Sequence, residues 1–411
     1  MVTAKLARTW LATLVLASGM AHAQSSLLLF EQALDLSLTT HPSVLSKRSE
    51  QAAAQADKAG AEWARYPTPS VEAATRRIKE TDSTALVRID QPLWTGGRIT
   101  AGIDAADSRY DAATAAISES RLDLSIRVIT SYTEALRQKD RLRHATVGVG
   151  EHEKLLEMIR RRVAQEVSSQ ADQRLAEARL LQARTDLSVT QQGLLNGLAQ
   201  LSQLSGQSVS DVAWEGVEGR SAPPGLEAAL QLAVDNSPVL RRLRYSEEAA
   251  SADIDSRRSA YWPQLTLRLE RAMEGSSADS RAMLVLTAQP GAGLSAASGV
   301  DAAISRRDAV RQERDSAERE VRERVTLDWN EWQAVQVRLQ TAQRASEISN
   351  EVFESYARQY VIGRKTWIDV LNAVRESTLA RFTLADARAQ SAAASLRLSA
   401  QTAGLRNIAG Y

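Results

Sequence analysis

Gln91-Pro92-Leu93-Trp94-Thr95-Gly96-Gly97-Arg98 stands between two kinds of pattern. Two runs of alternating apolar and polar residues precede it, and a long apolar pattern of helical period follows it. Proline cannot donate to a strand ladder and a glycine pair accepts positive φ, so this segment can end a strand and redirect the backbone into a helix. We predict a strand-to-helix switch formed by Gln91, Pro92, Trp94, Gly96 and Gly97.

The second half of the chain repeats this plan. Gln289-Pro290-Gly291-Ala292-Gly293 again follows two alternating runs and precedes a long helical pattern. His41-Pro42 matches Ser237-Pro238, and Tyr66-Pro67 matches Trp262-Pro263, each at an offset of 196 residues. A register held over such a span indicates an internal duplication, although the length alone would suggest two or three domains.

The alternating runs predict two β-hairpins, and the helical runs predict long coiled-coil helices. Leu265, Leu267 and Leu269 alternate with polar residues, which is typical of a strand with one apolar face. After each switch the apolar residues keep a near-heptad spacing over roughly 60 residues, which corresponds to a helix about 90–100 Å long.

These patterns divide the chain into a leader and two structural repeats. Residues 1–23 are expected to be a signal peptide. The first repeat covers 24–225, with strands at about 70–78 and 84–90, long helices at about 98–164 and 168–205, and a linker at 206–225. The second repeat covers 226–411, with strands at about 264–271 and 281–288 and long helices at about 295–361 and 365–402.

The first residues have the order of a secretory leader. Lys5 and Arg8 precede the apolar run 11–17, and Ala21-His22-Ala23 has the small-x-small form of a cleavage site. We therefore expect an exported protein whose mature chain begins at Gln24. The sequence contains no cysteine, so its stability relies on packing and not on disulfides.

Composition argues against several classes of function. The chain has 51 Lys and Arg against 50 Asp and Glu, which gives no basis for nucleic-acid binding. His41, His144 and His152 share no ligand spacing, and no phosphate-loop, nucleophile-elbow or zinc-protease motif occurs. We therefore expect no enzyme activity, no cofactor and no bound metal.

Past the leader, no stretch approaches the roughly 18 uncharged apolar residues of a membrane helix.

Each long helix must turn back, and a duplicated chain should repeat its turn. Val163 to Asp172 and Tyr360 to Asp369 superpose at an offset of 197 residues, which predicts bends at Ser168-Ser169 and at Gly363. An acidic residue then comes early in each returning helix, where the helix dipole favours negative charge. Gly148 is the alternative position for the first bend, although its counterpart in the second half contains no glycine.

This ordered set of features resembles the TolC-like outer-membrane efflux proteins. The resemblance covers nearly the whole mature chain and rests on the duplicated plan, the paired aromatic-Pro sites, the switch at 91–98, and Tyr360-x-x-Gly363 followed by Trp367-Ile368-Asp369-Val370-Leu371. It implies a mainly α fold with a small β part, in which a homotrimer forms a 12-stranded outer-membrane β-barrel, with four strands per subunit, continuous with a periplasmic α-helical barrel. A four-stranded piece of a barrel covers its edges only by pairing with its neighbours.

The resemblance also implies roles for residues around the two hairpin tips. The family's periplasmic gate falls on Asp172, Tyr360, Lys365, Asp369 and Asn372. Asp369 corresponds to an acidic ring at the constriction, and Asn372 departs from a frequent second acidic position. For Asp172 and Asp369 the alternative is plain helix N-terminal charge. The adaptor-docking tips fall on Glu166, Val167, Ser168, Ser169, Ile362, Gly363 and Arg364.

The implied function is the outer-membrane channel-tunnel of a tripartite export system that extends into the periplasm. The implied partners are further copies of the chain, a periplasmic membrane-fusion adaptor, an inner-membrane ABC transporter or other pump, the exported cargo and outer-membrane lipid. The chain is most similar to the branch that serves type I secretion of large adhesins, and multidrug or metal efflux is the alternative. A non-pore periplasmic coiled-coil scaffold is the alternative from another class of function.

Overall fold

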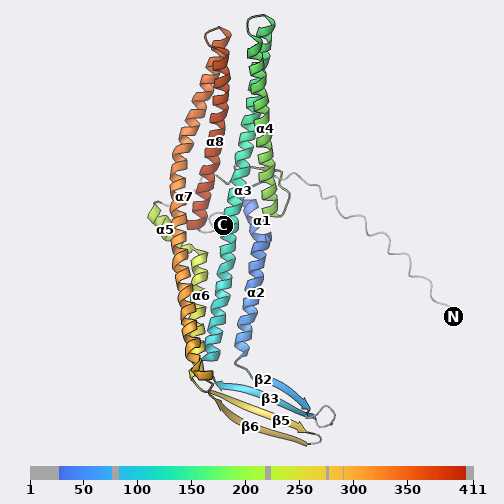
Figure 1. Cartoon of the computed structure of the whole chain (residues 1–411), viewed down its shortest axis with the longest axis vertical. Coiled ribbons are helices and arrows are strands. Elements are labelled where there is room, and N and C mark those ends of the chain that lie inside the picture. Colours follow the sequence, from blue (N-terminus) through green and yellow to red (C-terminus); the bar gives the residue numbers. More distant parts are fainter. Residues whose placement is uncertain (1–26, 76–82, 218–223, 275–276, 290, 404–411) are drawn as a thin grey trace, which may run out of the picture.

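A computed structural model describes residues 27–75, 83–217, 224–274, 277–289 and 291–403. The expected signal peptide at 1–23 and the expected mature N-terminus at Gln24 lie outside these residues. The described chain is elongated, with long antiparallel helices along most of its length and a small sheet at one end (Figure 1).

Four long helices form two hairpins that lie side by side. α3 spans Arg98–Ala164 and returns as α4, Gln170–Ser205. α7 spans Ala296–Val361 and returns as α8, Trp367–Thr402. α3 and α7 have 67 and 66 residues, so each is about 100 Å long. α3 packs against both α4 and α8, and α8 packs against α7, so the helices form a layer in the order α4-α3-α8-α7.

Shorter helices continue this layer toward the sheet. α1 and α2 span Phe30–Thr40 and Pro42–Trp63, and their counterparts α5 and α6 span Leu226–Asn236 and Pro238–Arg258. Each proline opens its helix at a position where a backbone N–H is not needed, and the residue before it caps the helix. α2 packs on α3, and α6 packs on both α3 and α7, so the order near the sheet is α2-α3-α6-α7.

The sheet has four antiparallel strands in the order β2-β3-β5-β6. They span Thr68–Thr75, Ser83–Trp94, Gln264–Glu274 and Ser277–Thr287. The 3-10 turn Ser259–Tyr261 joins α6 to β5, and the 3-10 turn Ala292–Leu294 leads from β6 to α7. The two β-hairpins meet at β3 and β5, which leaves β2 and β6 as the edge strands.

One face of the sheet carries charged pairs that lie directly across neighbouring strands. Arg268 Nε donates to Asp90 Oδ1 at 2.7 Å, and Arg88 Nε donates to Glu270 Oε1 at 3.0 Å. Opposite charges in directly paired positions stabilise a sheet by about 0.2–1 kcal/mol per pair. This face therefore satisfies its charges across the seam between the two hairpins.

The other face of the sheet is apolar. The alternate register positions bring Ile89 opposite Leu269 and Leu267 opposite Leu284. Leu284 is 66% exposed and Leu269 is 44% exposed, so the described chain itself leaves this face uncovered. Extended apolar surface of this kind marks a protein interface or a lipid contact.

Four predicted strand ends differ from the structure. β3 continues past residue 90 and through Pro92 to Trp94, because Pro92 lies opposite Thr266 beside a register shift, where a residue without an N–H is tolerated. β5 and β6 extend toward each other to Glu274 and Ser277, because the backbone ladder continues to that pair. β2 begins at Thr68, before the predicted 70, and its predicted end at 78 lies outside the described residues.

The returning helices begin two residues later than predicted. α4 begins at Gln170 and not at 168, and α8 begins at Trp367 and not at 365. Ser169 and Thr366 are their N-caps, whose side chains accept hydrogen bonds from backbone N–H groups of the first turn. α7 begins at Ala296, one residue after the predicted 295.

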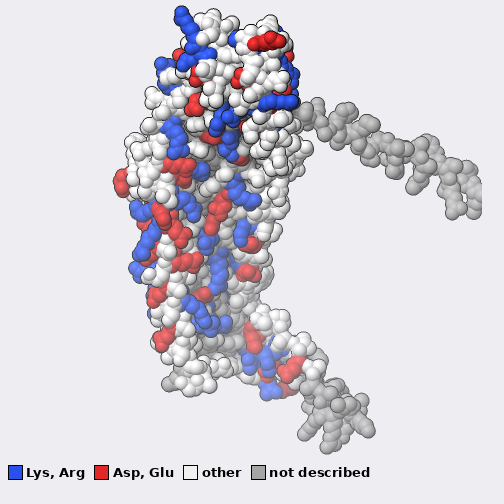
Figure 2. Space-filling model, turned by 45° about the horizontal axis from the view of Figure 1, so that its top comes forward, with Lys and Arg blue, Asp and Glu red and all other residues white. Residues whose placement is uncertain are grey.

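Charged side chains of both signs are interspersed along the helical body (Figure 2). Several of them join elements that are distant in sequence. Arg381 of α8 contacts Glu151 of α3 at 3.0 Å, and Arg242 of α6 contacts Glu119 of α3 at 2.6 Å. Acidic and basic residues therefore form ion pairs that connect neighbouring helices.

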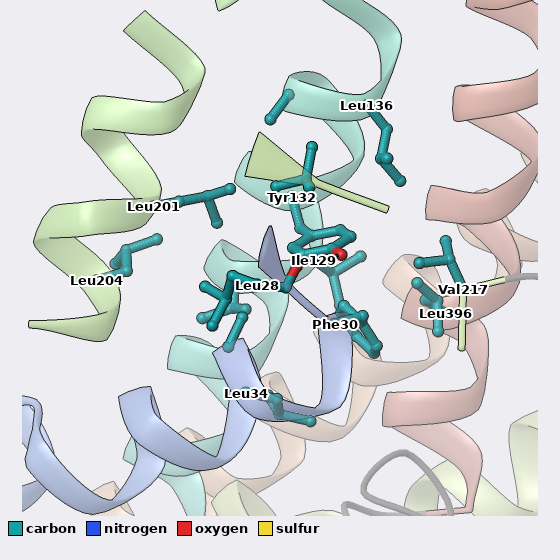
Figure 3. Close-up of a cluster of buried hydrophobic side chains, with 14 of the residues drawn as sticks. Leu28, Phe30, Leu34, Ile129, Tyr132, Leu136, Leu201, Leu204, Val217 and Leu396 are labelled. Carbon is teal, nitrogen blue, oxygen red and sulfur yellow. Dashed lines mark hydrogen bonds between the residues drawn. The ribbon is translucent and has the colours of Figure 1, made fainter. Parts of the chain in front are cut away.

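The largest buried cluster lies where α1 and the end of α4 meet the middle of α3 (Figure 3). The ring of Tyr132 is fully buried and meets the ring of Phe30 edge-on at a centroid distance of 5.4 Å. Tyr132 Oη lies 2.8 Å from the carbonyl oxygens of Leu28 and Ala213, and it accepts Ala213 N–H at 3.2 Å. Strands β1, Leu27–Leu28, and β4, Asp211–Val212, pair in parallel here. One side chain thus ties two distant segments to α3.

Candidate functional site

The predicted strand-to-helix switch is a tight crossing of two segments. Gly96 and Gly97 have φ of 59° and 90°, and Gly97 is the N-cap of α3. A Cβ atom on Gly96 would lie 2.9 Å from Trp262 Cβ, which is closer than real Cβ contacts come. Glycine is required at position 96 by the backbone conformation and by the close approach of Trp262, which belongs to the aromatic-Pro site of the second repeat.

Exposed aromatic side chains gather at this junction between helices and sheet. The rings of Trp63 and Tyr66 lie 5.1 Å apart at the end of α2. Gln91 Nε2 donates to the carbonyl oxygen of Arg65 at 3.0 Å and so ties β3 to the same end. Trp and Tyr concentrate where a membrane meets water, because their rings are apolar and their polar atoms remain hydrated. The exposed aromatic residues at this level are Trp63, Tyr66, Trp94, Tyr261 and Trp262.

We expect Gly96→Ala to lower the free energy of unfolding by more than the roughly 1–2 kcal/mol that left-handed backbone costs an alanine, because its Cβ also clashes with Trp262. The matched control is Gly60→Ala, since a Cβ at this helical position meets nothing within 4 Å. The control should stabilise the protein by about 0.5–1 kcal/mol. Chemical unfolding followed by circular dichroism measures both, and equal stability of the two variants would contradict the close crossing.

The two hairpin tips lie together at the end opposite to the sheet (Figure 1). Glu166 and Gly363, at matching positions in the two repeats, have φ of 60° and 76°. Glu166 is the only residue other than glycine with positive φ in the described chain. The first bend is therefore centred on Glu166 and not on Ser168-Ser169, because Ser169 is used as the cap of α4. Gly148, the alternative, lies inside α3.

Asp172 and Asp369 both complete N-terminal capping boxes. Asp172 Oδ2 accepts from Ser169 N at 3.2 Å and from Ser169 Oγ at 2.8 Å. Asp369 Oδ2 accepts from Thr366 N at 3.0 Å and from Thr366 Oγ1 at 2.8 Å. The hydrogen bonds from the Thr366 hydroxyl and backbone, together with the charge of Lys365, hold the pKa of Asp369 below its usual value. Each carboxylate therefore has a local structural role in the single chain.

Tyr360 and Trp367 link the two tips within one chain. Both are buried, and their rings lie 5.2 Å apart. Tyr360 Oη lies 3.5 Å from Ser168 Oγ, and the Arg162 guanidinium lies 4.8 Å from the centre of the Tyr360 ring. Trp367 Nε1 donates to the carbonyl oxygen of Asp172 at 3.2 Å. The second tip therefore contacts the first through the rings, and the Asp172 carboxylate takes no part in the link.

Arg162 and Trp367 are residues of this link to which the sequence patterns assigned no role. Lys365, which the resemblance places in the gate, lies with Nζ 4.2 Å from the centre of the Tyr356 ring on its own hairpin. Asn372 is exposed on α8. A tryptophan at the first position of a capped helix was the available signal, but only the packing shows that its N–H reaches the other hairpin.

The predicted adaptor-docking residues form the outermost surface of the tips. Val167 is 60% exposed and Ile362 is 65% exposed, and Val361 and Ile368 beside them are exposed as well. Ser168 is partly buried by the contact with Tyr360. The remaining predicted residues, Glu166, Ser169, Gly363 and Arg364, are exposed.

In the part of the chain that the structure describes, no group of three or more His, Cys, Asp or Glu residues could hold a metal ion. No helix in that part has the length and apolar character needed to span a membrane. An uncovered apolar sheet face at the end of long helical hairpins, with exposed aromatic residues between them, is the arrangement typical of proteins that contact lipid through their strands.

The outer membrane efflux protein family matches this chain at residues 33–207 and 229–404, once in each repeat. The chain belongs to this family, and the outer membrane is therefore its location. Over 214 residues, 49% of each chain, it is 25% identical to the cobalt-zinc-cadmium resistance protein CzcC of Cupriavidus metallidurans. The aligned part thus spans about half the length of this curated relative.

Solved structures share the fold over most of the chain. CusC superposes with a TM-score of 0.82 at 16% identity, and 91% of each chain is covered. VceC from Vibrio cholerae superposes with a TM-score of 0.80 at 16% identity over 91% of this chain and 96% of that one. The chain therefore has the fold of the TolC-like channel proteins, as the resemblance implied.

Proposed function

We propose that three copies of this chain close into a channel-tunnel, the outer-membrane component of a tripartite export system. The observation that carries the proposal is that each layer of the subunit has two open edges, and corresponding edges lie on the same side. α4, α2 and β2 form one edge, and α7 and β6 form the other. A head-to-tail contact between these edges closes into a ring.

The helical edges carry the apolar side chains that such a ring needs. Exposed apolar residues of this size on a periplasmic surface favour burial against another copy. The residues are Leu181, Val189 and Leu195 on α4, and Leu327, Val337 and Ile348 on α7.

In the sheet, pairing β6 of one copy with β2 of the next would satisfy the backbone groups of both edge strands, as a bilayer demands. Closure with the apolar face outward directs Leu267 and Leu284 to lipid and the pairs Arg268–Asp90 and Arg88–Glu270 to a water-filled lumen. The exposed aromatic level then lies at the periplasmic boundary of the membrane.

The periplasmic entrance is proposed to lie at the hairpin tips, with a gate formed by Asp172, Tyr360, Lys365, Asp369 and Asn372. The link between the tips supports this placement, because its partly buried hydrogen bonds are worth about 1 kcal/mol each and a partner can break them. A periplasmic adaptor is the proposed partner, and it would dock on the exposed apolar tips and couple the tunnel to an inner-membrane pump.

For the cargo, metal ions or other small solutes are favoured over a large adhesin. The similarity to a cobalt-zinc-cadmium resistance protein supports metal efflux, whereas nothing in the comparisons supports the type I secretion branch. A strain lacking the protein should lose growth in cobalt, zinc or cadmium while its surface adhesins remain unchanged. Unaltered metal tolerance together with lost surface adhesin would reverse the choice.

The experiment that tests the channel itself is fractionation followed by conductance. Heat-sensitive trimers in the outer-membrane fraction that conduct ions in a planar bilayer are expected. A soluble periplasmic species without conductance would favour the coiled-coil scaffold instead.

A variant that weakens the link between the tips should bias the tunnel toward its open state. Trp367→Phe removes the Nε1 donor to Asp172 while keeping a ring beside Tyr360. A lost hydrogen bond worth about 1 kcal/mol in each of three copies shifts the equilibrium between closed and open states roughly 100-fold. The matched control is Trp214→Phe, which removes a Trp donor to Asp140 Oδ2 far from the tips. In single-channel recording Trp367→Phe should be open more often than Trp214→Phe, and identical traces of the two variants would exclude this role of the link between the tips.

Asp369 tests the proposed acidic ring. In a threefold assembly its carboxylate is present three times near one axis, and the hydrogen bonds from Thr366 lower its pKa. Asp369→Asn should weaken the block of conductance by divalent cations without closing the tunnel, whereas Asp172→Asn should leave the block in place. If divalent cations block the conductance of Asp369→Asn as strongly as that of the wild type, Asp369 does not line the constriction.

A further inference from the structure

A cavity of about 370 Å³ lies between the two helical hairpins, where α4 and α8 flank α3. All of its lining residues belong to α3, α4 and α8 of the same chain. Gly148 forms part of its floor, and a Cβ there would lie 3.2 Å from Thr378 Oγ1, so α3 and α8 approach closely beneath it. This volume lies within the range of small-molecule sites.

The cavity contains two arginines that the described chain leaves without a carboxylate partner. Arg179 comes from α4 and Arg375 comes from α8. Neither forms an ion pair with a described residue, whereas the neighbouring arginine Arg184 pairs with Glu153 at 2.8 Å. Asp186 is the one acidic residue in the lining, and its Oδ1 accepts from Gln182 Nε2 at 2.9 Å. The lining therefore has an excess of positive charge.

His152 adds a further polar side chain, whose buried Nδ1 has no hydrogen-bond partner among the described residues. Its side chain lines the cavity from α3 and is only 7% exposed. Burial and then the charge of Arg179 lower the pKa of His152, against the opposing charge of Asp186. A buried polar atom of this kind costs about 1–3 kcal/mol unless a partner is supplied.

Part of the lining of the cavity is apolar. Phe382 and Leu379 from α8 and Ala145 and Ala183 from α3 and α4 line it beside the charged groups. A ligand that fits must therefore combine an anionic group with an apolar body. Guanidinium groups bind carboxylates in a fork geometry that matches both oxygens.

We propose that this cavity binds a small amphiphilic carboxylate, whose anionic group lies between Arg179 and Arg375 within reach of His152 and whose apolar body packs on Phe382. Since Arg179 belongs to the first hairpin and Arg375 to the second, the ligand would hold the two hairpins together. The site does not depend on which cargo the tunnel carries.

The test is calorimetric titration of the purified full-length protein with 1-naphthoate, with the neutral 1-naphthalenemethanol as the matched ligand that reports partition into detergent. Saturable binding of the carboxylate alone is expected. Arg179→Gln combined with Arg375→Gln should weaken it at least tenfold, because two charge-assisted contacts are lost. Arg184→Gln, on the same helix but paired outside the cavity, should bind as the wild type does.

Ala183→Phe provides an independent variant that fills the cavity and keeps both arginines. It should abolish binding of 1-naphthoate while the circular dichroism spectrum and trimer are retained. Equal binding of the carboxylate and the alcohol, or undiminished binding in either the double variant or Ala183→Phe, would overturn the proposal.

Discussion

Leu267→Arg is expected to lower the stability of the assembled protein in a bilayer by up to about 2–4 kcal/mol, the cost of an arginine on a lipid-facing position at the bilayer midplane. Leu267 lies opposite Leu284 on one side and Gln91 on the other. Arg271 is on the same face two register positions beyond Leu269, opposite Val87 and Ser280. Arg271 lies toward the hairpin end of β5 and Leu267 toward the helical end, and a long cationic side chain on this face can extend to water.

Arg268→Ser is the matched control for Leu267→Arg, since it changes the adjacent residue on the polar face. It removes the ion pair with Asp90, in which both side chains remain about one-third exposed. Such a water-accessible pair contributes about 0–1 kcal/mol. Urea unfolding of both variants in lipid bilayers, together with the yield of trimer, measures the difference. Equal loss in the two variants would show that the apolar face does not contact lipid.

Tyr132→Ala is expected to lower the free energy of unfolding by about 3–5 kcal/mol, the usual cost of removing a buried aromatic side chain. The variant empties the centre of the main cluster and removes the edge-on contact with Phe30. Tyr132→Phe retains the ring and loses only the hydroxyl. It should cost about 1–3 kcal/mol, because the carbonyl oxygens of Leu28 and Ala213 then lack this donor.

The hydroxyl of Tyr132 also predicts a dependence on pH. Burial raises its pKa from 10.0 to about 12, so the folded protein holds the phenolic proton at pH values where the unfolded chain releases it. Stability from this group is present below pH 10 and falls as the pH rises toward 12. Unfolding titrations of wild type and Tyr132→Phe across this range should converge at high pH, and parallel curves would contradict the role of the hydroxyl.

Some local features followed from residue patterns because they depend on near neighbours. Gly96 and Gly97 marked the start of α3 at Arg98, since backbone conformation at a glycine pair is a local property. The end of β3 did not follow, because whether Pro92 can remain in a strand depends on the register of β5. The positive φ of Glu166 was not predicted either, since a left-handed residue that is not glycine has no clear sequence signal.

In the candidate gate, too, local contacts could be predicted from the sequence, whereas contacts between distant residues could not. Asp172 and Asp369 could be placed early in returning helices from their offset, and their capping by Ser169 and Thr366 is local. The contact of Trp367 Nε1 with the backbone of Asp172 joins residues that are distant in sequence. No spacing rule reports such a pair, because it arises only when two hairpins pack.

By itself the sequence determined the duplication, the long helices, the alternating strands and the family. Periodicity, turn residues and the repeat offset can be identified from residue types and their spacing alone. The tertiary structure alone decided the layer orders α4-α3-α8-α7 and α2-α3-α6-α7, the ion pairs Arg268–Asp90 and Arg88–Glu270 across the seam of the sheet, and the cavity around His152. These depend on which surfaces meet across hundreds of residues, and contacts of that range are set by packing and not by local preference.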